Sequence, residues 1–166
     1  MQRDAARALV GLSVILLAPS SLAQSTVELG NTISVGEGDM GIEGISISTN
    51  QELILAHGAN SGIFLIDSNA PENNSHIEWN GDYSLLDSSF HPGGETAIMV
   101  GEGGNVLRMT LANSTIEQAG GPSTFGDTLL TSVSWNGDGS WAYIGGEDGW
   151  IWRFRGTSDG GIEATV

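Results

Sequence analysis

A segment of 22 residues occurs twice in this chain, 45 residues apart. SFHPGGETAIMVGEGGNVLRMT at 89–110 aligns without a gap with SWNGDGSWAYIGGEDGWIWRFR at 134–155, so that Arg108 meets Arg153. A fainter third copy lies at 45–67. A fixed period of this length predicts an architecture of repeated supersecondary units.

Each copy has the pattern of β-strands separated by tight turns. Trp141 and Tyr143 alternate with Ala142 and Ile144, and a period of two with aromatic and β-branched residues is typical of strands. The segments HPGG, NGDG, EGG and EDG supply residues that adopt the positive φ of hairpin turns. No stretch after residue 23 has a helical period, so the sequence predicts an all-β fold.

The strands are apolar on both faces, as in GIFLID at 62–67 and TAIMVG at 96–101. A sheet that faced water on one side would show a polar face, so we expect these sheets to be covered on both sides. Small four-stranded antiparallel sheets that repeat every ~40 to 50 residues are typical of β-propeller blades. The sequence predicts about three blades plus one extra strand, with units at about 27–70, 75–111 and 113–156 and the start of a fourth at 161–166.

Three blades are fewer than the roughly four to eight of a closed propeller. Three explanations follow for an incomplete or open propeller. The chain is a fragment of a longer protein, or copies of it associate to complete a ring, or its units form an open arc.

The repeats also resemble a known family. VSWNGDGSWAYIGGEDGWIWRF at 133–154 resembles a WD-repeat blade, and SFHPGGETAIMVGEGGNVLRM at 89–109 resembles the same plan. A weaker likeness links the glycine-rich strands to photosystem-assembly and sialidase-like propellers. Arg153-Phe154 stands where the family has its Trp-Asp dipeptide. The resemblance implies a β-propeller repeat protein.

The N-terminus has the order of a secretory signal peptide. Arg3 and Arg7 precede the apolar run ALVGLSVILLA, and Ser21 and Ala23 supply the small residues of a cleavage site. We therefore expect a signal peptide at 1–23, a mature domain at 24–166, and export to the periplasm or the extracellular space. An uncleaved N-terminal anchor is the alternative.

Charge and cysteine content exclude several classes of function. Twenty acidic residues face five arginines and no lysine, for a net charge of −15. Such a surface repels phosphate backbones and anionic lipids, which argues against nucleic-acid and membrane-surface binding. It either attracts cations or basic partners or serves solubility. The absence of cysteine excludes disulfides and thiolate zinc sites.

No pattern predicts a catalytic residue, a cofactor or a metal site. Asn136 to Ser140 and Glu147 have nearly the spacing of a calcium loop, but Trp141 stands where such loops need glycine, so we interpret NGDGS as a turn. The three histidines are isolated in sequence, and no Gly-x-Ser-x-Gly elbow is present.

Aromatic and basic residues of the last repeat suggest an interface. Exposed aromatic side chains usually mark interaction surfaces, and the candidate interface residues are Trp141, Trp150, Trp152, Arg108 and Arg153. The two arginines either belong to a ring of ligand-binding residues around a central channel or pair with an acid of a neighbouring unit.

The expected function is that of an exported, non-enzymatic scaffold. It would bind a protein partner, or associate with itself, through its terminal unit. Two alternatives stay open: a fragment of an extracellular propeller hydrolase or lyase that uses carboxylates from its turns, and a lectin-like or cation-binding module. Enzymatic activity is thus undecided from sequence, although the absence of a catalytic pattern favours a scaffold.

Overall fold

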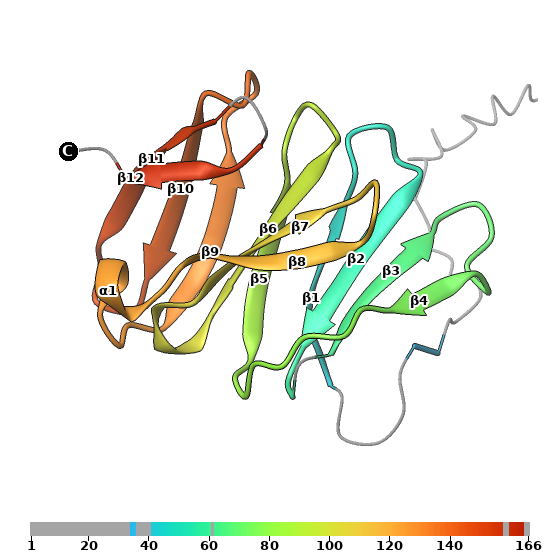
Figure 1. Cartoon of the computed structure of the whole chain (residues 1–166), viewed down its shortest axis with the longest axis horizontal. Coiled ribbons are helices and arrows are strands. Elements are labelled where there is room, and N and C mark those ends of the chain that lie inside the picture. The colour runs from blue at the N-terminus through green and yellow to red at the C-terminus, as the bar shows by residue number, and fades with distance from the viewer. Residues whose placement is uncertain (1–33, 36–40, 61, 158–159, 165–166) are drawn as a thin grey trace, which may run out of the picture. The chain divides into compact units, whose positions relative to one another are not determined.

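The computed structural model describes residues 34–35, 41–60, 62–157 and 160–164 (Figure 1). The signal peptide expected at 1–23 lies outside these residues. None of the described helices is long and apolar enough to cross a membrane.

Within the described residues, twelve strands form three antiparallel sheets of four strands each. The first sheet contains β1 (Ile42–Ile47), β2 (Leu53–Gly58), β3 (Ile63–Asp67) and β4 (Asn74–His76). The second contains β5 (Leu85–Phe90), β6 (Thr96–Gly101), β7 (Val106–Thr110) and β8 (Thr115–Gly120). The third contains β9 (Leu130–Trp135), β10 (Trp141–Gly146), β11 (Ile151–Gly156) and β12 (Ile162–Ala164). The predicted all-β class and four-stranded antiparallel sheets are confirmed.

The register of the strands confirms the repeat. In the second sheet Ile98 of β6 lies opposite Arg108 of β7, and in the third sheet Tyr143 of β10 lies opposite Arg153 of β11. Each residue of the second pair follows its counterpart in the first by 45 positions. Residues that align in sequence therefore occupy equivalent places in the two sheets.

Two short helical turns lie between the strands, η1 (Glu102–Gly104) and α1 (Pro122–Phe125). α1 departs from the expectation that no helix follows residue 23. Its four residues are too few to show a helical period in sequence. Pro122 starts the turn, where its missing N–H costs nothing, and the Phe125 side chain is buried.

The residues expected to begin a fourth unit form the last strand of the third sheet instead. β12 pairs antiparallel with β11, with Glu163 opposite Arg155. The Thr157 N–H donates a hydrogen bond to the Gly161 carbonyl at 2.9 Å, which extends the pairing beyond the ends of the two strands. The part of the chain that the structure describes thus has three four-stranded sheets and no extra strand after them.

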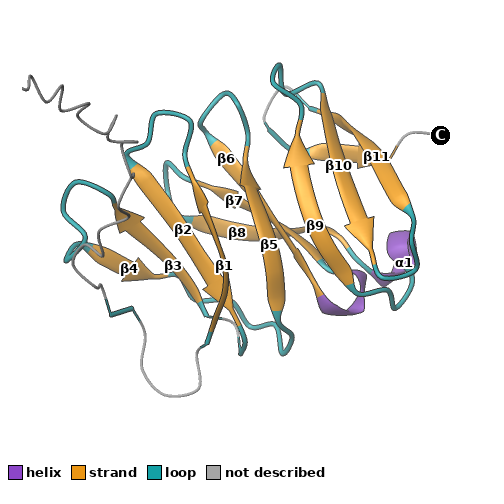
Figure 2. Ribbon diagram, turned by 180° about the vertical axis from the view of Figure 1, so that it is seen from behind, coloured by secondary structure: helices purple, strands orange, loops and turns teal. Residues whose placement is uncertain are grey.

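The three sheets lie side by side, and the first strand of each lies next to the first strand of its neighbour (Figures 1 and 2). Polar groups join these strands across the sheet boundaries. Ser46 Oγ of β1 lies 2.7 Å from Ser88 Oγ of β5, and Asp87 Oδ2 of β5 accepts a hydrogen bond from the Val133 N–H of β9 at 2.7 Å. Asp87 therefore satisfies a backbone donor on the edge strand of the third sheet.

Apolar side chains fill the space between neighbouring sheets. The cluster between the first and second sheets consists of Leu55, Ile63, Ile77, Leu85, Phe90, Ala97, Met99, Leu107 and Met109. The cluster between the second and third consists of Ile98, Val100, Val106, Phe125, Leu130, Val133, Trp135, Ala142, Ile144 and Phe154. All six residues of β6 are buried, so the second sheet is covered on both faces, as its apolar pattern predicted.

The identification as a WD-repeat-like β-propeller is wrong. The described residues form three separate sheets and no closed, propeller-like sheet. The sheets at the two ends expose apolar side chains, with Ile45 of β1 63% exposed and Ile151 of β11 74% exposed. The physical reason is that the strand and turn pattern of a repeat specifies the sheet alone. Closure depends on a contact between the end sheets, which that pattern does not encode.

Candidate functional site

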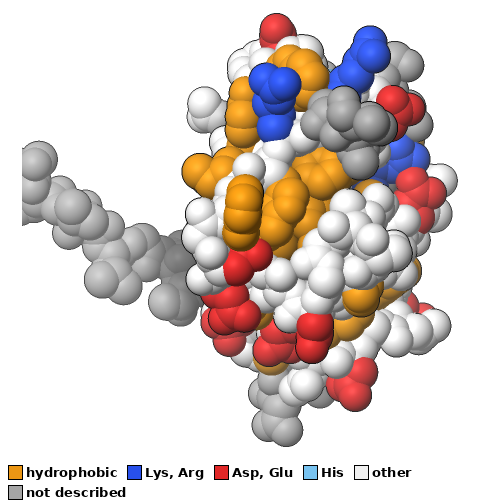
Figure 3. Space-filling model, turned by 90° about the vertical axis from the view of Figure 1, so that its left-hand side faces the viewer, with side chains coloured by type: hydrophobic (Ala, Val, Ile, Leu, Met, Phe, Trp, Pro, Cys, Tyr) orange, Lys and Arg blue, Asp and Glu red, His pale blue; other side chains and the backbone are white. Residues whose placement is uncertain are grey.

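The candidate site is the face of the third sheet that points away from the second sheet. We call it the outer face and define it by Trp141, Tyr143, Ile151, Arg153 and Arg155. These residues share one face because Trp141 lies opposite Arg155 and Tyr143 opposite Arg153, and side chains alternate along a strand. Seen from this side, hydrophobic side chains gather in a band, with basic groups near one end and acidic groups near the other (Figure 3).

The outer face is apolar and aromatic as well as basic. Tyr143 is 41% exposed and Ile151 is 74% exposed. Arg153 Cζ lies 4.2 Å from the centroid of the Trp141 ring, a cation–π contact. Arg153 and Arg155 are two of the five arginines of a chain that carries −15. The outer face therefore combines apolar area with local positive charge on an acidic protein.

The structure brings two of the predicted interface residues together and separates the others. Trp141 and Arg153 are in contact on the outer face. Trp150 is 68% exposed in the turn before β11. Trp152 points to the opposite side of β11, where its ring meets that of Phe125 edge to face at 5.6 Å. Trp152 thus belongs to the packing between sheets rather than to the exposed face.

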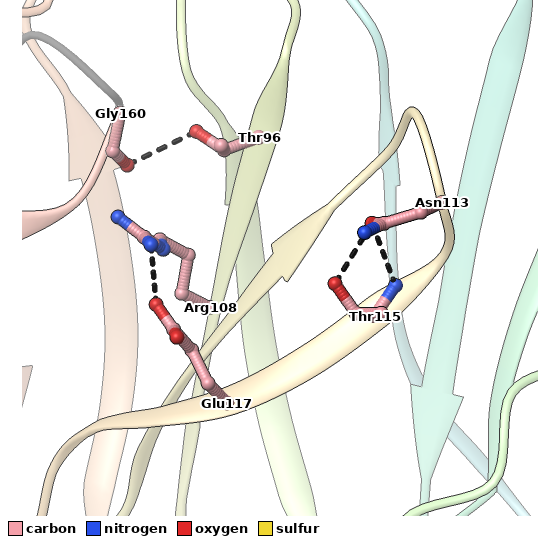
Figure 4. Close-up of polar contacts among 6 residues, drawn as sticks. All are labelled: Thr96, Arg108, Asn113, Thr115, Glu117 and Gly160. Atoms are coloured by element: carbon pink, nitrogen blue, oxygen red, sulfur yellow. Dashed lines mark hydrogen bonds and ion pairs between the residues drawn. The ribbon is translucent and has the colours of Figure 1, made fainter.

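Arg108 lies on the second sheet, at its boundary with the third. Its guanidinium forms an ion pair with Glu117 of the neighbouring strand β8 (Figure 4). The two side chains and Glu163 of β12 line the same small cavity of 220 Å³. Nearby, Thr96 Oγ1 donates to the Gly160 carbonyl at 3.0 Å. The bond from Thr96 to Gly160 thus links the second sheet to the segment before β12, whereas the ion pair lies within the second sheet.

Sequence reasoning missed a cavity of 360 Å³ beside the outer face. Its lining includes Asp87 of β5, Ser132 and Ser134 of β9, and Tyr143 and Ile151 of the outer face. The signal that could have found it is the 45-residue alignment. That alignment places Tyr143 and Ile151 on residues of the second sheet that face the third.

The histidines do not meet. His57 is fully buried between the first and second sheets, with Nδ1 3.1 Å from the Leu85 carbonyl. Burial lowers the pKa of His57 below its ordinary value, although the Leu85 carbonyl and the charges of Asp87 and Glu43 oppose this shift. Within the described residues no group of three histidine or acidic side chains could hold a metal ion.

The NGDGS segment is a turn, as predicted. The Asp138 carboxylate accepts hydrogen bonds from the Ser140 N–H at 2.9 Å and from the Ser140 hydroxyl at 2.6 Å. These bonds lower the pKa of Asp138. Asn136 Oδ1 accepts from the Trp141 N–H at 2.9 Å. The side-chain oxygens that resembled calcium ligands therefore hold the turn between β9 and β10.

No protein-family model matches the sequence, and no curated protein matches it either. Solved structures do resemble the fold. A candidate 6-phosphogluconolactonase from Bacteroides uniformis matches with a TM-score of 0.60 and 17% identity, over 75% of this chain and 40% of that one. A protein of unknown function from Desulfotomaculum acetoxidans matches with a TM-score of 0.66 and 16% identity, over 85% of this chain and 44% of that one.

These similarities concern the fold alone, because the sequence identities are low. The chain spans less than half the length of each of these two structures. Neither is a WD-repeat propeller, which is the second reason why that identification is wrong.

Proposed function

We propose that the protein is a non-catalytic scaffold whose outer face binds another protein. The observation that carries the proposal is that the outer face repeats, position for position, the face by which the second sheet packs on the third. Ile98 and Val106 of the second sheet are fully buried in that packing. Their equivalents in the outer face are Tyr143 and Ile151, which are exposed.

The energetics favour an occupied face. Burying a side chain of this size away from water stabilises a contact by about 1.5–3 kcal/mol. Exposed apolar patches on soluble proteins usually mark sites of interaction. The aromatic and arginine side chains of the outer face are the residue types enriched at the energetic centres of protein interfaces. In this proposal the three sheets form an open stack of blade-type units, exported with the help of residues 1–23.

Hydrogen bonds and an ion pair occupy three of the acidic side chains, and this supports a scaffold over a hydrolase. Asp87 accepts a backbone hydrogen bond across a sheet boundary, Glu117 is paired with Arg108, and Asp138 holds a turn. A glycosidase-type mechanism instead needs two carboxyl groups held about 5 to 9.5 Å apart around a substrate. The contacts of these three carboxylates give each a structural role.

Photo-crosslinking from the outer face tests the proposal. A benzoylphenylalanine at position 151 of the full chain, illuminated in the producing cell, should form a discrete protein adduct. The same label at Thr124, exposed on α1, is the control and should give none. Adding Tyr143→Glu to the labelled chain should abolish the adduct, because a charge would be buried in the contact. Equal labelling patterns at the two positions would contradict the proposal.

A further inference from the structure

The first sheet, at the other end of the stack, exposes apolar side chains of β1. They correspond to the β9 side chains that pack against the second sheet. Ile45 and Ile47 of β1 are 63% and 57% exposed. Ile47 lies opposite Ile54 in the first sheet, as Trp135 lies opposite Ala142 in the third. By this register Ile45 and Ile47 are the equivalents of Val133 and Trp135.

The surroundings of Val133 and Trp135 indicate which side chains would pack against the exposed isoleucines. Val133 is 6% and Trp135 9% exposed, and both belong to the cluster that packs against Ile98 and Val106 of the second sheet. The second-to-third boundary is thus made by one face with Ile98 and Val106 and another with Val133 and Trp135. The first half recurs on the outer face, and the second half recurs on β1 of the first sheet.

We propose that the outer face of one copy of this chain docks onto β1 of a second copy, head to tail. This inference rests on the proposed function and names the partner. In the joint, Tyr143 and Ile151 of one copy pack on Ile45 and Ile47 of the next. The joint repeats, in an intermolecular form, the part of the boundary between the second and third sheets that the inner strands make.

The backbone edge of β1 fits the same pattern. At the boundary inside the chain, Asp87 accepts a hydrogen bond from the Val133 N–H. The register places Ser132 where the second sheet has Asp87 and Ile45 where the third has Val133. The Ser132 hydroxyl of one copy thus stands in the place from which it would accept from the Ile45 N–H of the next.

Coverage of the first sheet limits the contact to its inner strand. Ala56, Phe64 and Ile66 on the same side are already buried, and Val35 packs against them. The isoleucines of β1 remain exposed beside them. The intermolecular joint therefore uses β1, just as β5 and β9 lie next to each other at the boundary within the chain.

Charge selects the head-to-tail arrangement over a symmetric one. Two outer faces placed against each other would bring the arginine pairs 153 and 155 of both copies together, and like charges repel. Docking on the other end places these arginines on a chain of net charge −15. Head-to-tail contacts of this kind are heterologous, so different surfaces meet at each joint.

Sedimentation of full-length variants tests the inference. The wild-type chain should sediment as more than one copy, whereas Ile151→Asp and Ile45→Asp should each abolish the self-association of their own chain. An equimolar mixture of the two variants should restore a one-to-one complex, because one copy keeps an intact outer face and the other keeps an intact β1. A monomeric wild type, an associated Ile45→Asp chain, or a mixture that stays monomeric would overturn the inference.

Cysteine crosslinking gives a second readout, since the chain has no native cysteine. Ile151→Cys mixed with Ile45→Cys should give a disulfide-linked heterodimer under mild oxidation, in clear excess over either homodimer. Thr124→Cys mixed with Ile45→Cys is the matched control and should crosslink at the background rate. Equal yields from the two mixtures would contradict the head-to-tail joint.

The two proposals fail in different ways. If the crosslinker at position 151 captures a different protein and the wild-type chain is monomeric, the scaffold stands and self-association is wrong. If position 151 gives no adduct in cells and the wild-type chain is monomeric, both are wrong.

Discussion

The second and third sheets have aligned sequences and the same strand register but different surroundings. All six residues of β6 are buried, whereas Tyr143 of the aligned strand β10 is 41% exposed. Val106 of β7 is fully buried, whereas its equivalent Ile151 is 74% exposed. The apolar pattern is thus set by the repeated sequence, whereas burial depends on whether a neighbouring sheet covers the face.

The largest expected effect comes from placing the same charge at the two equivalent positions. Val106→Asp should lower the free energy of unfolding by about 3–5 kcal/mol, because it buries a carboxylate without a partner. At protein concentrations at which the chain is monomeric, Ile151→Asp should change it by no more than about 0.5 kcal/mol, because the new side chain then faces water. Urea unfolding followed by tryptophan fluorescence measures both.

Similar losses at the two positions in the monomer would show that residues of the same chain cover the outer face. Ile151→Ala is the control that separates lost apolar area from added charge. On an exposed face it too should leave the free energy of unfolding nearly unchanged.

The hydrogen bond across the second boundary should have the next largest effect. Asp87→Ala removes the acceptor of the Val133 N–H and should cost about 1.5–3 kcal/mol of unfolding free energy, the range for a bond to a charged group. Ser132→Ala changes the equivalent position of the third sheet, where the side chain is exposed, and should cost less than about 0.5 kcal/mol. If Asp87→Ala also costs less than about 0.5 kcal/mol in urea unfolding, Asp87 contributes nothing to the boundary.

The two boundaries should also differ in their response to pH. His57 at the first boundary has a pKa below its ordinary 6.5 because it is buried. Between that lowered pKa and 6.5 the unfolded chain binds a proton that the folded chain does not. The free energy of unfolding should therefore fall as the pH falls through this window. The stabilising contribution of neutral His57 should be complete above pH 6.5.

His57→Val tests the origin of this pH dependence, because valine stands at the equivalent position of the second sheet, Val100. The variant should flatten the decline of unfolding free energy below pH 6.5, measured by urea unfolding at a series of pH values. A decline of the same slope in the variant would assign it to other groups.

The smallest expected effect concerns the stacking of Arg153 on Trp141. Arg153→Ala should cost about 0.5–1 kcal/mol of unfolding free energy, the range for an exposed cation–π contact. Arg155→Ala on the same face is the control and should cost less. A shift of tryptophan emission in the first variant but not in the second would locate the contact in solution.

The sequence predicted the strands and their repetition because both depend on local patterns. Alternation around Trp141 and Tyr143, and turns such as Asn136 to Ser140, are written into a few consecutive residues. What it did not predict depends on contacts between distant segments. The sequence predicts the start of a new unit at 161–166, because the pairing of Ile162–Ala164 with β11 leaves no pattern in those three residues themselves.

The candidate site was found only in part, for a similar reason. The interface residues predicted from the sequence include Trp152, whose side chain points toward the second sheet. They do not include Tyr143 and Ile151, which are exposed. The strand parity of each residue decides its face, and the direction of the neighbouring sheet decides which face is exposed. The first is readable from the sequence, whereas the second requires the arrangement of the sheets.

Each described sheet takes its four strands from one uninterrupted stretch of the chain. A cut between Gly120 and Leu130 would leave every strand ladder intact on both sides, so the covalent connection there carries no strand pairing. A gene that duplicated or lost one such stretch would change the number of sheets without re-pairing a single strand. Evolution can therefore add or remove whole sheets of this protein without disrupting the strand pairing of the others.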